Sequence, residues 1–393
     1  MPYWVYTDPE LYLREQELIF RGPSWSFVAL EAELDGPGDF KRTSVGDVPV
    51  IVVRDRGGTI RVLVNRCAHR GVQLCHQAWG KTRTFTCPYH QWNYALDGRL
   101  LGVPFKGGVK GQGGMSPGFE HAEHGLETLT VTTRNGVVFA SFDPGPPRLE
   151  DYLGDTNLGW FDRVFDGRPL DVLGYQRQIV PANWKLMFEN IKDPYHASLL
   201  HAFLVSFGLF RADNPSATQM DGPGRHSVLV SERGETGATA DTGDIARLME
   251  PIVLSDPRLL DPVREFEGSA TVVMQTIWPN LIVQQQSNTL AMRQLVPRDV
   301  ETFELHWTYF GYATDDDAMR TRRLRQANLM GPAGLVSIDD SEVMRLAQLG
   351  VRSAEDREAF VEMGGIDTAD TTHMVTEVAI RAFYAHYRAV MGL

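Results

Sequence analysis

Two cysteines and two histidines in one short stretch constrain this chain more than any other feature. They occur as Cys67-x-His69 and, after 17 intervening residues, as Cys87-x-x-His90. Each half brings one thiolate and one imidazole into a tight loop. This ligand set suits a cluster of two irons in which the cysteines bind one iron and the histidines bind the other. We therefore expect these four residues to hold a [2Fe-2S] cluster.

A structural zinc site is the alternative, because tetrahedral zinc uses the same ligand types. In zinc fingers each half usually supplies like ligands, whereas here each loop supplies one of each kind. The mixed loops, with Arg70-Gly71 and Pro88-Tyr89 beside them, favour a cluster of the Rieske type, whose potential is high enough to accept electrons from a ferredoxin or flavin. The third cysteine, Cys75, precedes His76, and adjacent residues cannot easily face one metal, so we predict that Cys75 is a buried thiol.

A second metal centre is indicated by Asp193-x-x-His196-x4-His201. A spacing of five rotates the two histidines by about 140° around a helix, so they converge only if the helix bends or one lies near its end. Taken alone, the two histidines could equally well be one buried in the core and one exposed at the surface. Because the upstream cluster implies a second redox centre, we predict a mononuclear non-haem Fe(II) site of two histidines and one carboxylate. Asp340 is the predicted third ligand, and Asp339 is the alternative.

Charge and hydropathy exclude several partners. Lys and Arg number 38 against 50 Asp and Glu, a net charge of −12, so neither nucleic acid nor an anionic membrane surface is an expected partner. The longest apolar run, Ser198 to Phe210, is far shorter than the roughly 20 residues that cross a bilayer. Acidic residues within Met1 to Phe20 argue against a secretory leader, so we expect a cytoplasmic protein. The glycine-rich segment Gly107 to Gly114 fits no dinucleotide or Walker pattern, so electrons must come from another polypeptide.

The pattern of elements predicts an α+β protein with two domains. Residues 25–145 contain short β-type runs with turn signals, which predicts an all-β Rieske domain. Residues 1–24 and 146–393 mix helical and strand patterns, which predicts a catalytic domain built on an antiparallel sheet with helices. Within it we expect the following elements: a helical centre in Asn183–Phe210, a pair of strands in Ala270–Val296 turning at Ser287-Asn288, and helices over Asp316–Leu329 and Thr371–Gly392.

The whole chain resembles the large (α) subunit of Rieske non-haem iron aromatic-ring-hydroxylating oxygenases. The four cluster residues match the family's cluster motif, and Asn183 through His201 match its iron motif. It is most similar to the branch that acts on aromatic acids, salicylate 5-hydroxylases first, then anthranilate and terephthalate dioxygenases. The segments that carry this likeness are Cys87 through Tyr94, Glu189 through His196, Gly331 through Gly334 and His373 through Glu377. Gln91 departs from the glycine that many members have there and could alter hydrogen bonding at the cluster.

The resemblance implies an oxygenase that uses dioxygen and electrons from a ferredoxin and an NAD(P)H-dependent reductase on separate chains, with a small β subunit in an α3β3 assembly. It also implies that electrons cross between neighbouring subunits through Asp193, lying between a cluster histidine of one chain and His196 of the next. A carboxylate can accept hydrogen bonds from both imidazoles. The alternative role for Asp193 is a helix N-cap. Two functions of other classes are the alternatives: a Rieske electron carrier without oxygenase activity, and a zinc-stabilised binding module.

Three residues are predicted to bind substrate, namely Arg293, Asn190 and Met374. Alternation places Arg293 on the same strand face as Ala291 and Leu295. A cation on this face has two explanations. Its side chain either forms a salt bridge or reaches solvent at the edge of the sheet, or its guanidinium binds a substrate carboxylate. Because apolar Met374 cannot neutralise a second carboxylate, we predict a substrate with one carboxylate and a small ortho group. The expected reaction is salicylate to gentisate, and anthranilate, terephthalate or another benzoate is the alternative substrate.

Overall fold

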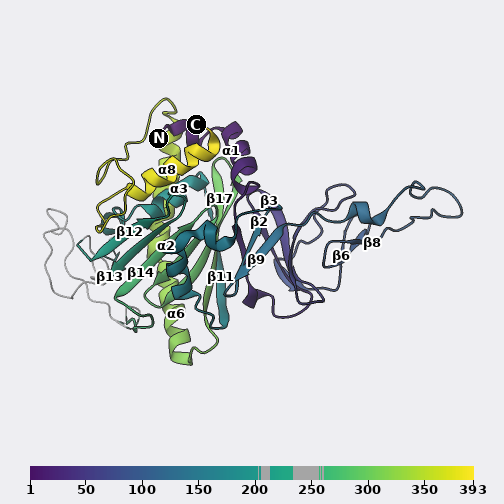
Figure 1. The fold of residues 1–393 in the computed structure, drawn as a ribbon, viewed down its shortest axis with the longest axis horizontal. Coiled ribbons are helices and arrows are strands. Elements are labelled where there is room, and N and C mark those ends of the chain that lie inside the picture. The colour runs from purple at the N-terminus through teal and green to yellow at the C-terminus, as the bar shows by residue number, and fades with distance from the viewer. Residues whose placement is uncertain (202, 205–212, 233–255, 257, 259–260) are drawn as a thin grey trace. The chain divides into compact units, whose positions relative to one another are not determined.

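The computed structural model describes residues 1–201, 203–204, 213–232, 256, 258 and 261–393. They form two compact units, one from Phe20 to Pro147 and the other from Met1–Ile19 together with Arg148–Leu393 (Figure 1). The first unit is β-rich and the second combines helices with a large antiparallel sheet, which confirms the predicted α+β class. Within the described residues, no helix has both the length and the apolar character needed to cross a bilayer.

The β-rich unit is built from three antiparallel sheets. Its elements are β1 (Ser26–Leu30), η3 (Glu31–Glu33), β2 (Asp39–Val45), β3 (Val48–Arg54), β4 (Ile60–Val64), β5 (Trp79–Lys81), β6 (Phe85–Thr86), β7 (Asn93–Tyr94), β8 (Leu100–Gly102), η4 (His121–His124), β9 (Thr130–Arg134) and β10 (Val137–Ser141). The strand orders are β1-β10-β9, β4-β3-β2-β5 and β6-β7-β8. Successive residues of β3 face two different apolar clusters, because side chains alternate along a strand. One of these clusters also contains Cys67 and Cys87, so both motif loops are anchored in a packed core.

A seven-stranded antiparallel sheet is the centre of the larger unit as described. Its strands are β11 (Leu170–Val180), β12 (Ser216–Met220), β13 (Ser227–Glu232), β14 (Ala270–Ile277), β15 (Leu281–Gln286), β16 (Thr289–Asp299) and β17 (Thr302–Tyr312), in the order β11-β17-β16-β15-β14-β13-β12. The register places Leu229, Met274 and Gln284 opposite one another on β13, β14 and β15. These three side chains therefore share one face of the sheet.

Helices from both ends of the chain pack in the larger unit. They are η1 (Tyr3–Tyr6), α1 (Pro9–Glu15), η2 (Gln16–Phe20, whose last residue belongs to the β-rich unit), α2 (Leu149–Val164), α3 (Trp184–Lys192), α4 (Ala197–Leu200), α6 (Asp317–Met330), α7 (Leu335–Arg352) and α8 (Val378–Met391). Buried Glu15 on α1 accepts hydrogen bonds from Trp184 Nε1 at 2.7 Å, Lys185 Nζ at 2.6 Å and the Tyr387 hydroxyl at 2.6 Å. This charged network fixes the start of α3 between α1 and α8.

The helix expected within Asn183–Phe210 is interrupted. Helix α3 ends at Lys192, and Asp193-Pro194 separates it from the single turn of α4. Proline has no N–H to continue a helical ladder, which accounts for the break. Residues 202 and 205–210 of the expected segment lie outside the described residues. At the C-terminus, helix α8 starts at Val378, later than the expected Thr371.

The prediction of two strands within Ala270–Val296 is wrong, because the segment contains one strand more. Three strands cross this segment, β14, β15 and β16. The turn at Ser287-Asn288 joins β15 to β16 as predicted, and a second turn at Trp278–Asn280 joins β14 to β15. Pro279-Asn280 in that second turn is a turn signal that the pattern-based prediction did not use. The helix expected over Asp316–Leu329 is α6, whose N-cap is Asp316.

Candidate active site

The two halves of the Cys–His motif form loops with the same backbone hydrogen bonds. In each loop the cysteine N–H donates to the carbonyl five residues later, and the cysteine carbonyl accepts from the N–H four residues later. These bonds join Cys67 to Val72 (2.8 Å), Gly71 to Cys67 (2.9 Å), Cys87 to Trp92 (2.8 Å) and Gln91 to Cys87 (3.0 Å). The two loops thus share one backbone frame, although the histidine is the second residue after the cysteine in the first loop and the third in the second loop.

Gln91 occupies a left-handed backbone position. Its φ is 57°, and the equivalent residue of the first loop, Gly71, has a φ of 75°. Residues other than glycine enter this region at a free-energy cost. The loop geometry thus gives a backbone reason for glycine at this place, separate from the change in cluster hydrogen bonding that the sequence suggested.

The four motif side chains fit a Rieske cluster. Cys67 and Cys87 are buried, and the rings of His69 and His90 lie with their centroids 4.7 Å apart. Nδ1 of His90 is buried without a hydrogen-bond partner among the described residues, as suits a nitrogen that binds a metal. The Tyr94 hydroxyl lies 3.2 Å from Sγ of Cys67, where it can hydrogen-bond a ligand sulfur. Cys75 is a buried thiol, as predicted, with Sγ 3.5 Å from the Gln77 carbonyl.

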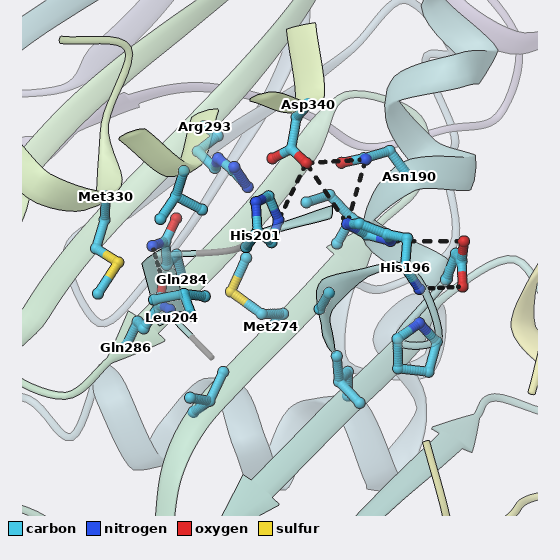
Figure 2. Close-up of a pocket in the computed structure, with 17 residues that line it drawn as sticks. Asn190, His196, His201, Leu204, Met274, Gln284, Gln286, Arg293, Met330 and Asp340 are labelled. Atoms are coloured by element: carbon cyan, nitrogen blue, oxygen red, sulfur yellow. Dashed lines mark hydrogen bonds and ion pairs between the residues drawn. The ribbon is translucent and has the colours of Figure 1, made fainter. Parts of the chain in front are cut away.

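His196, His201 and Asp340 come together in the larger unit (Figure 2). Oδ1 of Asp340 lies 3.5 Å from Nε2 of His196 and 3.3 Å from Nε2 of His201. The histidines converge because helix α4 is a single turn, with His196 directly before it and His201 directly after it. Ligands about 2.0–2.2 Å from one metal and at right angles stand roughly 3 Å apart, so this trio fits one ion. Two imidazoles and one carboxylate are the donor set of a non-haem Fe(II) site.

Helix α7 decides between the two neighbouring aspartates. Its buried residues follow helical spacing, namely Ser337, Asp340, Met344, Gln348 and Val351. Asp340 therefore faces inward, whereas the Asp339 side chain is 35% exposed. Oδ2 of Asp339 lies 3.5 Å from Nδ1 of His201, on the other nitrogen of the same ring. Asp340 thus joins the metal-ligand group, and Asp339 is placed to orient His201.

Electrostatic coupling within the trio sets its protonation before metal binds. Burial alone raises the pKa of Asp340, but hydrogen bonds with the two histidines outweigh it and hold the pKa well below its usual range. Burial alone lowers the pKa of His196, whereas Asp193 and Asp340 raise it to about 10. To bind a divalent metal, His196 would therefore have to give up a proton.

Asp193 lies directly after α3 and next to the trio. Its Oδ1 accepts from the N–H groups of Tyr195 at 2.8 Å and His196 at 3.2 Å, so it caps the turn that leads into α4. Its Oδ2 lies 3.5 Å from Nδ1 of His196, an ion-pair contact outside hydrogen-bonding geometry. The helix N-cap role weighed from the sequence is not observed, because the N-cap of α4 is His196 and Asp193 is the C-cap of α3; what Asp193 does make is this turn and a contact with a candidate metal ligand. Asn190 Nδ2 donates to Oδ1 of Asp340 at 3.1 Å, so this pocket residue also touches a metal ligand.

A pocket lies between the trio and the sheet (Figure 2). One side is the sheet face formed by Leu229, Val272, Met274, Gln284, Gln286 and Arg293 of strands β13 to β16. The other side comprises the trio, Asn190 and the apolar side chains Leu204, Met330 and Val336. The pocket is therefore largely apolar, with its polar groups concentrated at the metal ligands and along β15 and β16.

Arg293 is the only lysine or arginine among the residues that line this pocket as described. It is 3% exposed, and its Nε and Nη1 atoms are buried without a hydrogen-bond partner among the described residues. Burial lowers its pKa to about 10, so it stays cationic at neutral pH. This placement contradicts the rim salt bridge and the snorkelling side chain that the sequence left open. Among the described residues Arg293 forms no ion pair, although the charge of Asp340 acts on it at longer range. Burying such a cation costs free energy, and an anionic ligand in the pocket would offset that cost.

Met374 does not line the pocket, so its predicted contact with substrate is wrong in this structure. It is 1% exposed and packs with Leu204, Leu329 and Met330 in one apolar cluster. Sequence reasoning also missed Gln284, which does line the pocket. The run Gln284-Gln285-Gln286 was a usable signal, because alternation puts two of its three amides on one strand face.

Comparison with known proteins gives the same organisation. Residues 24–112 match the Rieske [2Fe-2S] domain, and residues 163–393 match the catalytic domain of the ring hydroxylating alpha subunit. The chain is 49% identical to the large oxygenase component of salicylate 5-hydroxylase from Ralstonia sp. over 100% of this chain and 94% of that one. It is 43% identical to the large subunit of anthranilate 1,2-dioxygenase from Burkholderia cepacia, over 100% and 93% of the two chains.

A third relative and a solved structure are also similar to this chain over its whole length. The chain is 41% identical to the terminal oxygenase component subunit alpha 2 of terephthalate 1,2-dioxygenase from Comamonas sp., over 100% of this chain and 95% of that one. Naphthalene 1,2-dioxygenase from Rhodococcus sp. bound to indole superposes with a TM-score of 0.82 at 25% identity, over 100% and 94% of the two chains. A catalytic domain excludes both the lone electron carrier and the zinc-stabilised module. The chain belongs to the family of Rieske ring-hydroxylating oxygenase α subunits, oxidoreductases with a [2Fe-2S] cluster and a mononuclear iron.

Proposed function

We propose that this chain hydroxylates an aromatic ring that carries a single carboxylate, with salicylate as substrate and gentisate as product. The observation that carries the proposal is Arg293, a buried guanidinium with unpaired N–H groups in the pocket beside the iron ligands. A guanidinium can bind both oxygens of a carboxylate at once, which fixes the ring's position as well as its charge. Similarity to the salicylate 5-hydroxylase component supports this choice of acid.

The proposal assigns roles to the metal-binding residues, to Arg293 and to the apolar lining of the pocket. Cys67, His69, Cys87 and His90 hold the [2Fe-2S] cluster, and His196, His201 and Asp340 hold the iron. When bound, the iron supplies dioxygen chemistry and the cluster supplies electrons. Arg293 binds the carboxylate, and Met274, Met330 and Leu204 cover the ring and exclude water. Asn190 holds Oδ1 of Asp340 in place through its hydrogen bond.

The electron path and partners follow the family. Asp193 connects His196 to the cluster histidine of a neighbouring subunit within an α3β3 assembly containing a small β subunit. A ferredoxin and an NAD(P)H-dependent reductase, both separate chains, supply the electrons, and the cytoplasm is the proposed location. The Asp193 contact with Nδ1 of His196 supports this path, because it leaves the carboxylate on the outer nitrogen of a metal-binding imidazole.

The charge of the pocket argues against terephthalate. That substrate carries two carboxylates, whereas Arg293 is the single lysine or arginine of the described lining. A second anion would be buried without a partner at a cost of several kcal/mol, at an order-of-magnitude level. Anthranilate, with one carboxylate and an ortho amine, is the remaining alternative.

The test replaces the cation and measures affinity. Arg293→Met removes the fork but keeps an apolar side chain of similar length, and Arg298→Met makes the same change further along β16, where Arg298 pairs with Glu304 at 2.8 Å outside the pocket. The dissociation constant for salicylate should rise by one or two decades in Arg293→Met, on the order of a charge-assisted hydrogen bond, and stay near parent in Arg298→Met. Unchanged affinity in Arg293→Met would sink the proposal.

A further inference from the structure

Four residues that line the pocket have a buried polar atom without a hydrogen-bond partner among the described residues, namely Asn190, His196, Gln284 and Arg293. Of the three other than Arg293, Gln284 is the one on the strand that pairs with the strand of Arg293. It lies on β15, is 2% exposed and lines the pocket. Its Nε2 donates to Oε1 of Gln286 at 2.9 Å, which fixes the amide, while its own Oε1 is buried without a partner among the described residues (Figure 2). A buried acceptor left without a donor is costly, so this atom is suited to a donor that the described residues do not supply.

The strand register sets Gln284 beside Arg293. Ile282 is directly opposite Arg293, and Gln284 follows Ile282 by two residues on the same face of β15. Gln284 is therefore a diagonal cross-strand neighbour of Arg293, within reach for long side chains. The pocket thus offers unpaired donors on Arg293 and an unpaired acceptor on Gln284 next to one another.

We propose that Gln284 determines specificity by accepting a hydrogen bond from a hydroxyl or amine ortho to the substrate carboxylate. This inference rests on the proposed function, because it requires that Arg293 hold the carboxylate. An ortho donor lies on the ring carbon next to the one that bears the carboxylate. When Arg293 binds the carboxylate, the ortho donor is therefore close to Gln284, which is adjacent to Arg293. Benzoate or an ortho-halogenated acid leaves Oε1 of Gln284 unpaired, so those acids bind more weakly.

The internal hydrogen bond of salicylate does not remove this preference. In water the hydroxyl donates to its own carboxylate, but a bidentate guanidinium competes for those carboxylate oxygens. The hydroxyl can then turn its proton to Gln284. The amine of anthranilate has two hydrogens, so one stays available for Gln284 even if the other remains internal. Both acids therefore meet the same requirement.

The experiment compares acids that differ only in the ortho donor. Dissociation constants for salicylate, anthranilate, 2-fluorobenzoate and 4-hydroxybenzoate are measured by titration calorimetry on the parent oxygenase, Gln284→Met and Gln285→Met. Gln285 is on the same strand but outside the pocket lining, and its Nε2 is engaged by the carbonyls of Thr271 and Ser287. The parent should prefer salicylate to 2-fluorobenzoate by about tenfold, the worth of one buried hydrogen bond. Gln284→Met should reduce that ratio to near one, and Gln285→Met should keep it.

The Gln284→Glu variant keeps a hydrogen-bond acceptor at this position. Gln284→Glu should weaken every acid through charge repulsion yet retain the preference for salicylate over 2-fluorobenzoate. An unchanged ratio in Gln284→Met, or 4-hydroxybenzoate binding the parent as tightly as salicylate does, overturns the inference. If Arg293→Met weakens all four acids while Gln284→Met keeps the ratio, only the role of Gln284 is wrong. If Arg293→Met changes none of them, the proposed function itself fails.

Discussion

Arg293 and Trp307 lie directly opposite each other on strands β16 and β17, with Cζ of Arg293 4.1 Å from the centroid of the Trp307 ring. The indole face attracts a cation, and the attraction is stronger away from water. Trp307 is 1% exposed, so this contact lies in the core beneath the pocket. The register of the two strands thus places an aromatic ring face against a guanidinium that forms no ion pair with a carboxylate of the described residues.

Replacing Trp307 should weaken substrate binding without touching the substrate. Trp307→Leu removes the aromatic face, and the dissociation constant for salicylate should rise roughly tenfold to thirtyfold, since a desolvated cation–π contact contributes up to about 2 kcal/mol. Trp307→Phe keeps an aromatic face and should stay closer to parent. Titration calorimetry on both variants checks this, and equal affinities for Leu and Phe would show that the ring face does not position Arg293.

The iron ligand assignment predicts different outcomes for two adjacent aspartates. Asp340→Ala removes a ligand atom and should lose the mononuclear iron, while the visible spectrum of the [2Fe-2S] cluster stays intact because other residues hold it. Asp339→Ala removes only the carboxylate near Nδ1 of His201, so most of the iron should remain. Iron and acid-labile sulfide counts per chain distinguish the two. Loss of iron in Asp339→Ala alone would reverse the assignment.

Asp193→Asn tests the proposed electron path. The amide can still accept from the backbone N–H groups of Tyr195 and His196, so the turn should persist. It cannot accept from two imidazoles as a carboxylate does, so turnover should fall by orders of magnitude with cluster spectrum and iron content retained. Single-turnover kinetics should place the loss in electron transfer from the reduced cluster to the iron. Normal product formation would contradict the path.

One buried histidine, His226, and one half-buried histidine, His386, predict acid sensitivity of the larger unit. Burial holds the pKa of His226 well below its usual value, and burial lowers the pKa of His386 to about 4. The unfolded chain, with histidine pKa values of about 6.5, therefore binds more protons than the folded chain between these values. Stability is full above about pH 6.5 and falls as the pH drops toward 4.

The check is the thermal midpoint at pH 7.5 and pH 5. Between pH 7.5 and pH 5, the thermal midpoint of His386→Gln should fall less than that of the parent, because one of the two histidines with a lowered pKa is removed. His373→Gln replaces an exposed histidine of the same unit and should follow the parent curve. If the thermal midpoints of all three proteins fall equally between pH 7.5 and pH 5, His386 does not contribute to the acid sensitivity.

Short-range motifs were readable from the sequence because their chemistry depends on spacing. The Cys–His loops and the His196–His201 pair needed few long-range contacts, and α4 places both histidines by a single turn. Asp340 could not be separated from Asp339 until α7 was seen, because its buried face is partly polar, with Ser337 and Gln348 beside Asp340. A pattern search for apolar residues misses such a stripe.

Pocket residues were harder to predict because they depend on register between strands. Arg293 was found as a cation within an apolar run, but its partner Trp307 is fixed only by the pairing of β16 with β17. Met374 was misplaced for a related reason: proximity in the chain to a family motif does not show which side of a core a side chain faces. Its place with Leu329 and Met330 is a tertiary contact.

The most direct measurement is the product formed from salicylate under ¹⁸O₂ with a ferredoxin and reductase supplying electrons. We predict 2,5-dihydroxybenzoate with one labelled oxygen, identified by chromatography and mass spectrometry, and no comparable turnover of terephthalate. Catechol or 2,3-dihydroxybenzoate as the main product, or faster turnover of terephthalate than of every monocarboxylic acid tested, would contradict the account.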